Sequence, residues 1–363
     1  MIRSIYIDNY RSVKNVFLEL NRLNIVFGPN GCGKSNLYKA IQLLSGAASG
    51  QLSEMFSSEG GIQNTMWSGS NMSDQKARRI CLSCETDDFD YELQVGFPDT
   101  SPGNPTLFKL DSIVKEENIW TAGFKRRPSS QVLKRKNQVV FLTNIHGEKI
   151  THNGAIYENE SFFGQLGEPH LYPEISQVKE TIKNWRFYHE FDVSRKSPIR
   201  QPQIGFRSPV LSSDGSNLAS AFQTIVEIGD IELLTEILLT AFPECSFFCK
   251  NDNARFMLYM NRIGLARPLE TSEMSDGTIR FLCLAVALLS PRPPNFIVLN
   301  EPENSLHPQM LPALAKLISQ ASRYSQIWLT SHSHELATFI GKYAEFQLYE
   351  LSISNGQTCI HRI

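Results

Sequence analysis

Apolar and polar residues follow three different rhythms along the chain. Residues 2–8 alternate with a period of two, which predicts a β-strand. Residues 23–27 and 295–299 are short apolar runs, a pattern typical of strands buried on both faces. Residues 36–44 repeat apolar side chains at helical spacing, and residues 282–289 are apolar throughout and predict a second helix. The chain is therefore expected to combine buried strands with helices, as an α/β protein does.

The middle of the chain changes rhythm more than once. Residues 76–160 contain several alternating stretches, which favour an antiparallel sheet with hairpins. Residues 170–240 favour helices, with 217–239 the clearest run, whereas residues 51–75 are rich in Gly, Ser, Asn and Met and favour an irregular segment. The expected parts are a core in two halves (1–50 and 245–363), a β-rich region (51–160) and a mainly helical lobe (161–244).

A glycine-rich motif lies between a predicted strand and a predicted helix. Residues 28–35 read G-P-N-G-C-G-K-S and match the phosphate-binding pattern G-x-x-x-x-G-K-[ST]. In such a loop the backbone N–H groups point at the phosphates, and the helix dipole adds roughly half a positive charge. Lys34 is expected to reach the phosphates and Ser35 to ligate Mg²⁺. We infer that the chain binds a nucleoside triphosphate through Asn30, Gly31, Cys32, Gly33, Lys34, Ser35 and Asn36.

Polar side chains follow two further buried strands near the C-terminus. Asn300 and Glu301 come directly after the apolar run 295–299. A phosphate-loop protein needs one group there near Mg²⁺ and another near the attacking water. His332 follows a second predicted strand, 325–330, and is expected at the same sheet edge, within reach of the γ-phosphate. The order of loop, acid and histidine favours one site assembled from these parts.

A serine, an aspartate and a glycine precede the apolar helix at 282–289. Ser275 or Asp276 is expected to cap this helix by accepting hydrogen bonds from its free N–H groups. Two interpretations stay open. The motif either caps the helix and does nothing more, or presents the helix N-terminus to a phosphate held by a second subunit.

In their order and rough spacing, these motifs resemble the heads of ABC-type ATPases, and among them the RecF/SMC-like branch with its stand-alone bacterial AAA_21-like members. Residues 9–12, N-Y-R-S, resemble an N-terminal segment of that branch, and residues 213–218 resemble a segment of the stand-alone group. The resemblance implies a P-loop NTPase core in which helices flank a mixed β-sheet, with an antiparallel β region and a helical lobe. It also implies ATP and Mg²⁺ as cofactors and ATP hydrolysis as the activity.

The resemblance further implies an ATP-dependent homodimer that holds two ATP molecules between head-to-tail subunits. Glu301 would be the general base for the water, and His332 would sense the γ-phosphate. The implied catalytic residues are Glu301, His332 and Lys34, the implied metal ligands are Ser35 and Asn300, and the implied contacts from the second subunit are Ser275, Asp276 and Gly277.

Three positions depart from the general ABC pattern. Asn300 stands where most relatives carry an aspartate, so Mg²⁺ is expected to be held less strongly. Asp276 replaces the second-position glycine of the general signature, which is usual in this branch. His307 occupies the region where transporters carry an aspartate. Gln177 is a weak candidate for the glutamine that contacts Mg²⁺ in transporters, and a surface glutamine is the alternative.

Charge and cysteine content narrow the interpretation. The net charge of −2 gives no global attraction to nucleic acid, so any basic surface must be local. Lys125, Arg126, Arg127, Lys134, Arg135 and Lys136 form the one dense run of cations, read either as a nucleic-acid contact or as a solvated loop. The seven scattered cysteines suggest no disulfide framework. With no apolar signal core or long apolar span, we expect a soluble, cytoplasmic protein without membrane contact.

Two functional classes remain. The first is an ATP-hydrolysing molecular switch that engages nucleic acid, in DNA repair or anti-phage defence. The second is an ATP-gated regulatory subunit that controls a separately encoded effector protein such as a nuclease or toxin. No nuclease signature is found in the sequence.

Overall fold

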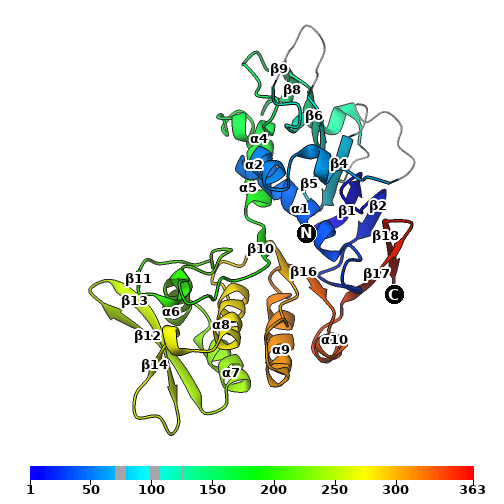
Figure 1. Ribbon diagram of the computed structural model, residues 1–363. Coiled ribbons are helices and arrows are strands. Elements are labelled where there is room, and N and C mark those ends of the chain that lie inside the picture. The colour runs from blue at the N-terminus through cyan, green and yellow to red at the C-terminus, as the bar shows by residue number, and fades with distance from the viewer. Residues whose placement is uncertain (70–78, 99–106, 124–125) are drawn as a thin grey trace. The chain divides into compact units, whose positions relative to one another are not determined.

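The computed structural model describes residues 1–69, 79–98, 107–123 and 126–363, and its chain divides into two compact units (Figure 1). The first unit comprises Met1–Asn21, Phe27–Trp185 and Tyr349–Ile363. The second comprises Arg22–Val26 and Arg186–Leu348. These limits differ from the three parts expected from the sequence, because each unit collects segments that are far apart along the chain.

An eight-stranded antiparallel sheet dominates the described part of the first unit, in line with the alternation of its sequence. Strand β8, next to the edge strand β9, shows this alternation clearly, since Val140 and Leu142 are buried whereas Val139 and Phe141 are exposed. In sheet order the strands are β2 (Val16–Glu19), β1 (Ile2–Asp8), β4 (Arg79–Thr86), β5 (Phe89–Gly96), β6 (Ile113–Thr121), β7 (Gln131–Lys136), β8 (Val139–Thr143) and β9 (Lys149–Thr151).

Helices of the first unit pack beside this sheet (Figure 1). They are α1 (Lys34–Ser49), α2 (Leu52–Ser58), α3 (Ile62–Thr65), α4 (Phe162–Gln165) and α5 (Pro173–Lys183). The irregular segment expected at 51–75 is wrong for the part that α2 and α3 occupy. Leu52 and Phe56 lie one helical turn apart, and both are buried. Polar residues lie beside this apolar pair in the sequence and obscure its helical spacing. A C-terminal hairpin, β17 (Gln347–Ser354) and β18 (Gln357–Arg362), completes this unit from Tyr349 onward.

The second unit is built on buried, parallel strands. β10 (Arg186–Tyr188) pairs in parallel with β15 (Phe296–Asn300), and β15 pairs in parallel with β16 (Gln326–Ser331). Residues 23–26 of β3 (Leu23–Phe27) lie beside β16. Every residue of β15, β16 and β3 is buried, as the largely apolar sequences of β3 and β15 predict.

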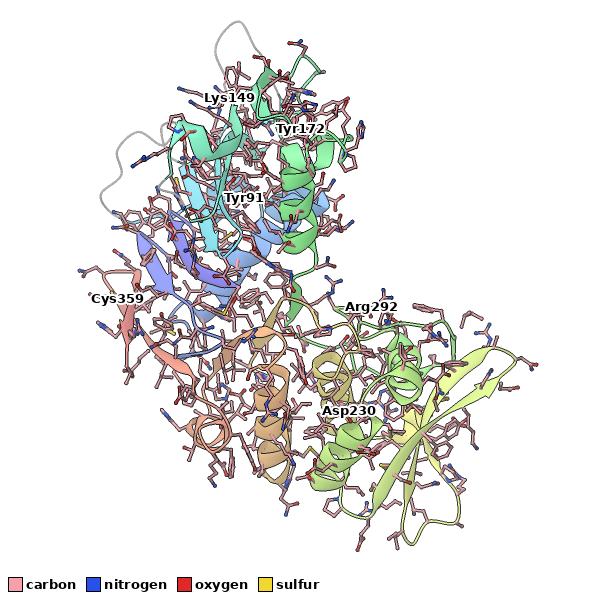
Figure 2. All side chains as sticks on the ribbon, turned by 180° about the vertical axis from the view of Figure 1, so that it is seen from behind. Tyr91, Lys149, Tyr172, Asp230, Arg292 and Cys359 are labelled. Carbon is pink, nitrogen blue, oxygen red and sulfur yellow. The ribbon has the colours of Figure 1, made fainter. Side chains whose placement is uncertain are left out.

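Helices and a second, antiparallel sheet cover the rest of this unit. The run expected at 217–239 forms two helices instead of one. The first helix ends before Gly229. The side chain of Asp230, which is labelled in Figure 2, caps the second helix by accepting from the Leu233 N–H. The elements are α6 (Leu218–Ile228), α7 (Ile231–Ala241), α8 (Asp276–Leu288), α9 (Leu311–Ala321), α10 (His334–Ile340), β11 (Gln203–Ile204), β12 (Cys245–Asp252), β13 (Arg255–Arg262) and β14 (Leu269–Glu270).

Strands β12 and β13 form a hairpin and pair from Cys245 to Arg262. None of the helices in the described parts of the chain has the length and apolar character that a membrane crossing requires.

Candidate functional site

The glycine-rich loop ends at the N-terminus of α1 in the first unit. Gly33 is the N-cap of this helix, with a φ of 100°, and no side chain caps the first turn. A Cβ at Gly33 would overlap Thr358 Oγ1 and lie 2.9 Å from Ser12 Oγ, so only glycine fits. Lys34 is 5% exposed, and its Nζ donates to the Gly28 carbonyl at 2.5 Å. The loop therefore offers a helix N-terminus and an ammonium group side by side, which suits a phosphate.

Two segments distant in sequence support this loop. Thr358 of β18 donates through Oγ1 to the Cys32 carbonyl at 3.0 Å. The Thr358 and Ser12 hydroxyls are 2.7 Å apart, and Asn36 of α1 donates to Ser12 Oγ at 2.8 Å. The N-Y-R-S segment and the C-terminal hairpin therefore hold the loop in place through these hydrogen bonds.

The same N-terminal segment is held in strained backbone geometry. Arg11 has a φ of 50°, which is uncommon for a residue with a side chain. Its guanidinium pairs with Glu59 at 2.9 Å, and the Tyr10 hydroxyl donates to the same carboxylate at 2.9 Å. Burial raises the pKa of Tyr10 well above its ordinary value, and the Glu59 charge raises it further. These contacts hold the backbone that places Ser12 against the loop.

In the second unit, Asn300 ends β15 at the carboxyl edge of the parallel strands. Its amide is fixed from both neighbouring strands. Thr330 of β16 donates to Asn300 Oδ1 at 2.7 Å, and Asn300 Nδ2 lies 2.7 Å from Nδ1 of His189. His189 directly follows β10, whose Tyr188 is in register with Leu299 of β15. Sequence reasoning missed His189, because no motif marks it and only the pairing of β10 with β15 brings it to this edge.

Glu301 follows Asn300 and adopts a φ of 46°, a conformation that turns the chain sharply after the strand. Its N–H donates to the Thr330 carbonyl at 2.9 Å, and Asn304 Nδ2 donates to Glu301 Oε2 at 2.8 Å. Nδ1 of His332 lies 3.8 Å from Glu301 Oε1. The structure thus brings Asn300, Glu301 and His332 together at one sheet edge, as the order of motifs predicted.

Glu303 joins these two strand ends and was not assigned a role from the sequence. Its Oε1 accepts from the Ser331 hydroxyl at 2.5 Å and from the His332 N–H at 3.0 Å. The side chain is 6% exposed, and its Oε2 is buried without a hydrogen-bond partner among the described residues. Glu303 therefore anchors the backbone that carries the His332 ring. The signal for it was the second acid in N-E-P-E.

The S-D-G motif forms the N-terminus of α8. Ser275 is the N-cap, since its Oγ accepts from the Thr278 N–H at 3.2 Å, so one of the two expected caps is confirmed. Ser275 and Asp276 are both exposed. A Cβ at Gly277 would lie 2.8 Å from the Ser305 carbonyl oxygen, so this tip packs directly on the chain that follows Glu301.

Two weaker candidates have local roles. His307 is exposed, and its Nδ1 accepts from the Gln309 N–H at 3.3 Å, which makes it the cap of a short helical turn. Gln177 lies in the middle of α5 in the first unit, on a helix rather than at a strand end.

Among the described residues of the basic run, Arg126 and Arg135 are paired with carboxylates, whereas Lys134 and Lys136 are exposed. Arg126 makes ion pairs with Glu85, Asp90 and Glu92 at 3.3–3.7 Å. Arg135 lies on β7 with its side chain completely buried, whereas its neighbours Lys134 and Lys136 are exposed. Lys125 lies outside the described residues. A strand places successive side chains on opposite faces, so Arg135 cannot share a surface with the lysines beside it.

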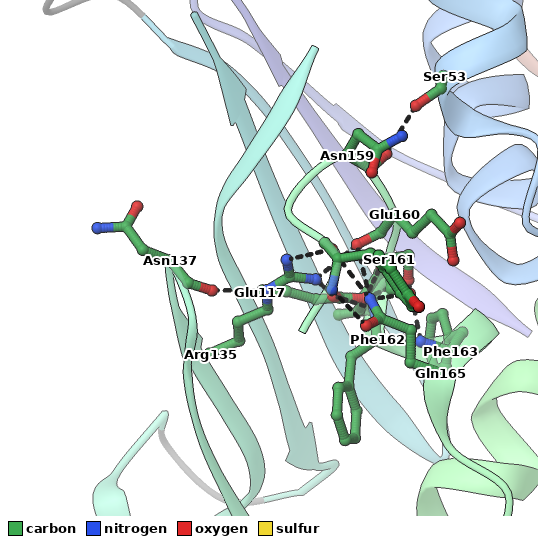
Figure 3. A network of polar contacts seen from close by, with 12 residues as sticks. Ser53, Glu117, Arg135, Asn137, Asn159, Glu160, Ser161, Phe162, Phe163 and Gln165 are labelled. Atoms are coloured by element: carbon green, nitrogen blue, oxygen red, sulfur yellow. Dashed lines mark hydrogen bonds and ion pairs between the residues drawn. The ribbon is translucent and has the colours of Figure 1, made fainter. Parts of the chain in front are cut away.

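Arg135 instead belongs to a buried network inside the first unit (Figure 3). It donates to the carbonyls of Asn137, Tyr157 and Glu160, and it pairs with Glu117 at 3.5 Å. Burial lowers the pKa of Arg135, and the Glu117 charge opposes this shift. Glu117 also accepts from the Ser161 hydroxyl and the Phe162 N–H, so the network fixes the start of α4.

The two cysteines of β4, Cys81 and Cys84, do not share a face of the strand. Cys84 is buried and Cys81 half-buried, on opposite faces of β4. Burial raises the pKa of Cys84 to about 12 and that of Cys81 to about 11. Within the described residues, no group of three or more His, Cys, Asp or Glu side chains is arranged to hold a metal ion.

The comparisons with known proteins concern family and fold. A family model described as “AAA domain, putative AbiEii toxin, Type IV TA system” matches residues 23–338. No curated protein matches the chain. Among solved structures, an SMC head bound to the C-terminal winged-helix domain of ScpA is similar, with a TM-score of 0.56 and 15% identity over 100% of this chain and 98% of that one. An SMC head with an extended coiled coil, bound to the C-terminal domain of ScpA from Pyrococcus furiosus, is also similar. Its TM-score is 0.52, with 14% identity over 100% of this chain and 96% of that one.

These findings confirm the expected fold class and family. The likeness to the solved heads extends over the whole chain, and the α/β architecture is the one that the resemblance implied. Because the family model covers residues 23–338, the protein belongs to the AAA_21 family of P-loop ATPases, with the fold of an SMC head.

Proposed function

We propose that the protein is an ATP-hydrolysing molecular switch that dimerises head-to-tail around ATP. The observation that carries the proposal is the strand-end cluster of the second unit. There the Glu301 carboxylate is positioned by Asn304 and lies beside His332. A carboxylate oriented in this way can accept a proton from an attacking water, and a neighbouring imidazole can contact a phosphate.

Each remaining site residue has a role in this proposal. The loop at residues 28–35 binds the phosphates of ATP, with Lys34 on the β- and γ-phosphates. Ser35 and Asn300 serve Mg²⁺, which neutralises phosphate charge when it is bound. Asn300 fits this role through Oδ1, which retains one lone pair beyond its bond to Thr330. Since an amide carries no charge, the metal is held less strongly than by an aspartate.

The exposed tip of α8 supports the proposed dimerisation. Ser275 and Asp276 are exposed at a helix N-terminus, where backbone N–H groups favour an anion. In the dimer, each ATP bridges the loop of one subunit and the Ser275–Gly277 tip of the other. Hydrolysis removes the bridging γ-phosphate and loosens the dimer, which is how the nucleotide acts as a switch.

The output of the switch has two candidates. In the first, the dimer engages nucleic acid in DNA repair or anti-phage defence. In the second, it gates a separately encoded effector protein, such as a nuclease or toxin. The pairing of Arg126 and Arg135 with carboxylates favours the second, because it leaves fewer cations of the basic run for a phosphate backbone. The family description names a toxin, and the similar SMC heads are bound to a protein partner, ScpA.

The decisive experiment uses Glu301→Gln, which keeps the shape of the side chain but removes the base. With ATP and Mg²⁺ this variant is expected to form a stable dimer in sedimentation velocity, with turnover reduced by about a hundredfold or more. Ser275→Arg in the same background is expected to stay monomeric while it still binds ATP. Glu345→Gln, an exposed substitution in the second unit, serves as the matched control. A Glu301→Gln protein that stays monomeric in saturating ATP would reject the dimer.

Stimulation of ATPase activity separates the two outputs. The first candidate predicts faster turnover with single- or double-stranded DNA, and a fall in that stimulation as salt rises. The second predicts turnover that DNA does not change.

A further inference from the structure

Arg200 is a buried arginine outside the residues assigned to the candidate site. It ends a short helical turn, Pro198–Arg200, and its side chain is 6% exposed. All three nitrogens of its guanidinium make hydrogen bonds. Nε donates to the Val193 carbonyl at 2.8 Å, NH1 donates to the carbonyls of Thr271 and Met274 at 2.9 Å each, and NH2 donates to Asp276 Oδ1 at 2.5 Å.

Two of these acceptors, the carbonyls of Thr271 and Met274, lie on the segment that leads into α8. Thr271 and Met274 flank the tight turn immediately before the helix cap Ser275. A planar guanidinium can bind two carbonyls and a carboxylate at once, in a fixed geometry that a lysine ammonium cannot reproduce. Arg200 therefore determines where Ser275 stands and how the first N–H groups of α8 point.

The contact of Arg200 with Asp276 places a positive charge beside a carboxylate at the N-terminus of α8. Asp276 is the first residue of α8, and its side chain is 66% exposed. A free carboxylate at this place would repel a triphosphate brought to the helix N-terminus. The Arg200 guanidinium both neutralises that carboxylate and holds it to one side, so the backbone N–H groups remain the groups that meet an anion.

We propose that Arg200 is a positioning residue for the nucleotide bound by the other subunit: it sets the geometry of the Ser275–Gly277 tip and cancels the charge of Asp276. This inference rests on the proposed ATP-bridged dimer. It also explains how the chain carries Asp276 where the general signature has glycine, because the buried Arg200 is the counter-ion of that carboxylate.

Three substitutions in the Glu301→Gln background separate the geometric effect from the charge effect. Arg200→Lys keeps the charge but loses the fork of hydrogen bonds, Arg200→Gln loses both, and adding Asp276→Asn to Arg200→Gln removes the uncompensated acid. Arg207→Lys is the matched control, since Arg207 is exposed and pairs only with Glu227 among its described ion pairs. The readouts are fluorescent ATP-analogue binding, ATP-induced association by sedimentation, and hydrogen exchange of residues 271–278.

Arg200→Lys is expected to bind the analogue within about twofold of the parent, because the phosphate loop belongs to the other unit, but to associate about tenfold more weakly. Exchange at residues 271–278 should rise in the same variant. Asp276→Asn is expected to restore association of Arg200→Gln by about threefold or more. If Arg200→Gln does not fold, Arg200→Lys and its exchange pattern decide the question.

The outcomes are distinguishable from failure of the dimer itself. A Glu301→Gln parent that never associates rejects the proposed function. A parent that associates, with an Arg200→Lys variant that associates equally well, overturns the role of Arg200. Unchanged exchange at residues 271–278 in Arg200→Lys overturns the positioning effect, and a double variant no better than Arg200→Gln overturns the charge effect.

Discussion

Replacing Glu303 tests whether the two strand ends of the candidate site act as one assembly. Its Oε1 accepts two hydrogen bonds, from the Ser331 hydroxyl and the His332 N–H, while its buried Oε2 has no hydrogen-bond partner in the part of the chain that the structure describes. Glu303→Ala removes the acceptor and leaves both donors unsatisfied. The variant should therefore lose stability and also release the backbone that carries His332.

The magnitude follows from these contacts. A hydrogen bond to a charged group contributes about 1.5–3 kcal/mol, so the loss of two costs about 3–6 kcal/mol. The alanine also removes a buried carboxylate oxygen that has no partner, which returns about 1–3 kcal/mol of desolvation cost. We expect a net loss of roughly 2–4 kcal/mol for Glu303→Ala. Glu303→Gln keeps an uncharged acceptor and should lose about half as much.

Urea unfolding followed by fluorescence measures this loss, and the buried Trp328 on β16 contributes signal from the same unit. Glu345→Ala is the control, because Glu345 is exposed in that unit. ATPase turnover should fall further in Glu303→Ala than in Glu303→Gln, in proportion to the loss of the His332 anchor. A Glu303→Ala protein as stable as the control, with unchanged turnover, would show that this carboxylate does not join the two strands.

Three shorter predictions concern other parts of the chain. Lys34→Ala should weaken binding of a fluorescent ATP analogue by about tenfold or more, because it removes the ammonium beside the loop; retained affinity would place the nucleotide elsewhere. Glu117→Ala should destabilise the protein by about 3–5 kcal/mol in urea unfolding, since it leaves Arg135 buried without its counter-charge, whereas exposed Lys134→Ala should stay within about 0.5 kcal/mol. Burial raises the pKa of Cys81 to about 11, so this thiol should react with iodoacetamide at pH 8 about a hundredfold more slowly than a thiol of pKa 9. Its reaction should become faster as the pH rises toward 11. A rate at pH 8 equal to that of the thiol of pKa 9 would contradict the burial of Cys81.

Much of the architecture was predictable because it depends on local patterns. The apolar runs at 23–27 and 295–299 became β3 and β15, each within one residue of the expected limits. The cap at Ser275 and the glycine-rich start of α1 likewise follow from short-range chemistry. Side chains that immediately follow buried strands could be placed at a sheet edge, and Asn300, Glu301 and His332 were found on that basis.

Long-range pairing set the limit of prediction. Arg135 was counted with its neighbours as a surface cation, although the alternation of β7 alone should have separated it from Lys134 and Lys136. What the sequence could not reveal is its partner, because Glu117 lies on another strand. Arg200 is a similar case, since its acceptors at Thr271, Met274 and Asp276 lie more than 70 residues further along the chain.

The amide at Asn300 is explained by a residue that sequence reasoning missed. Thr330 donates to Asn300 Oδ1, so the remaining amide nitrogen faces His189 as a donor. Nδ1 of His189 must then offer a lone pair, and any proton on a neutral ring resides on Nε2. An aspartate at position 300 would present a second acceptor to that lone pair, and the contact at 2.7 Å would become repulsive unless Nδ1 carried the proton. The departure from aspartate is thus matched to a histidine that directly follows the adjacent strand β10. The two positions together specify an uncharged, oriented oxygen at the edge where the metal is proposed to bind.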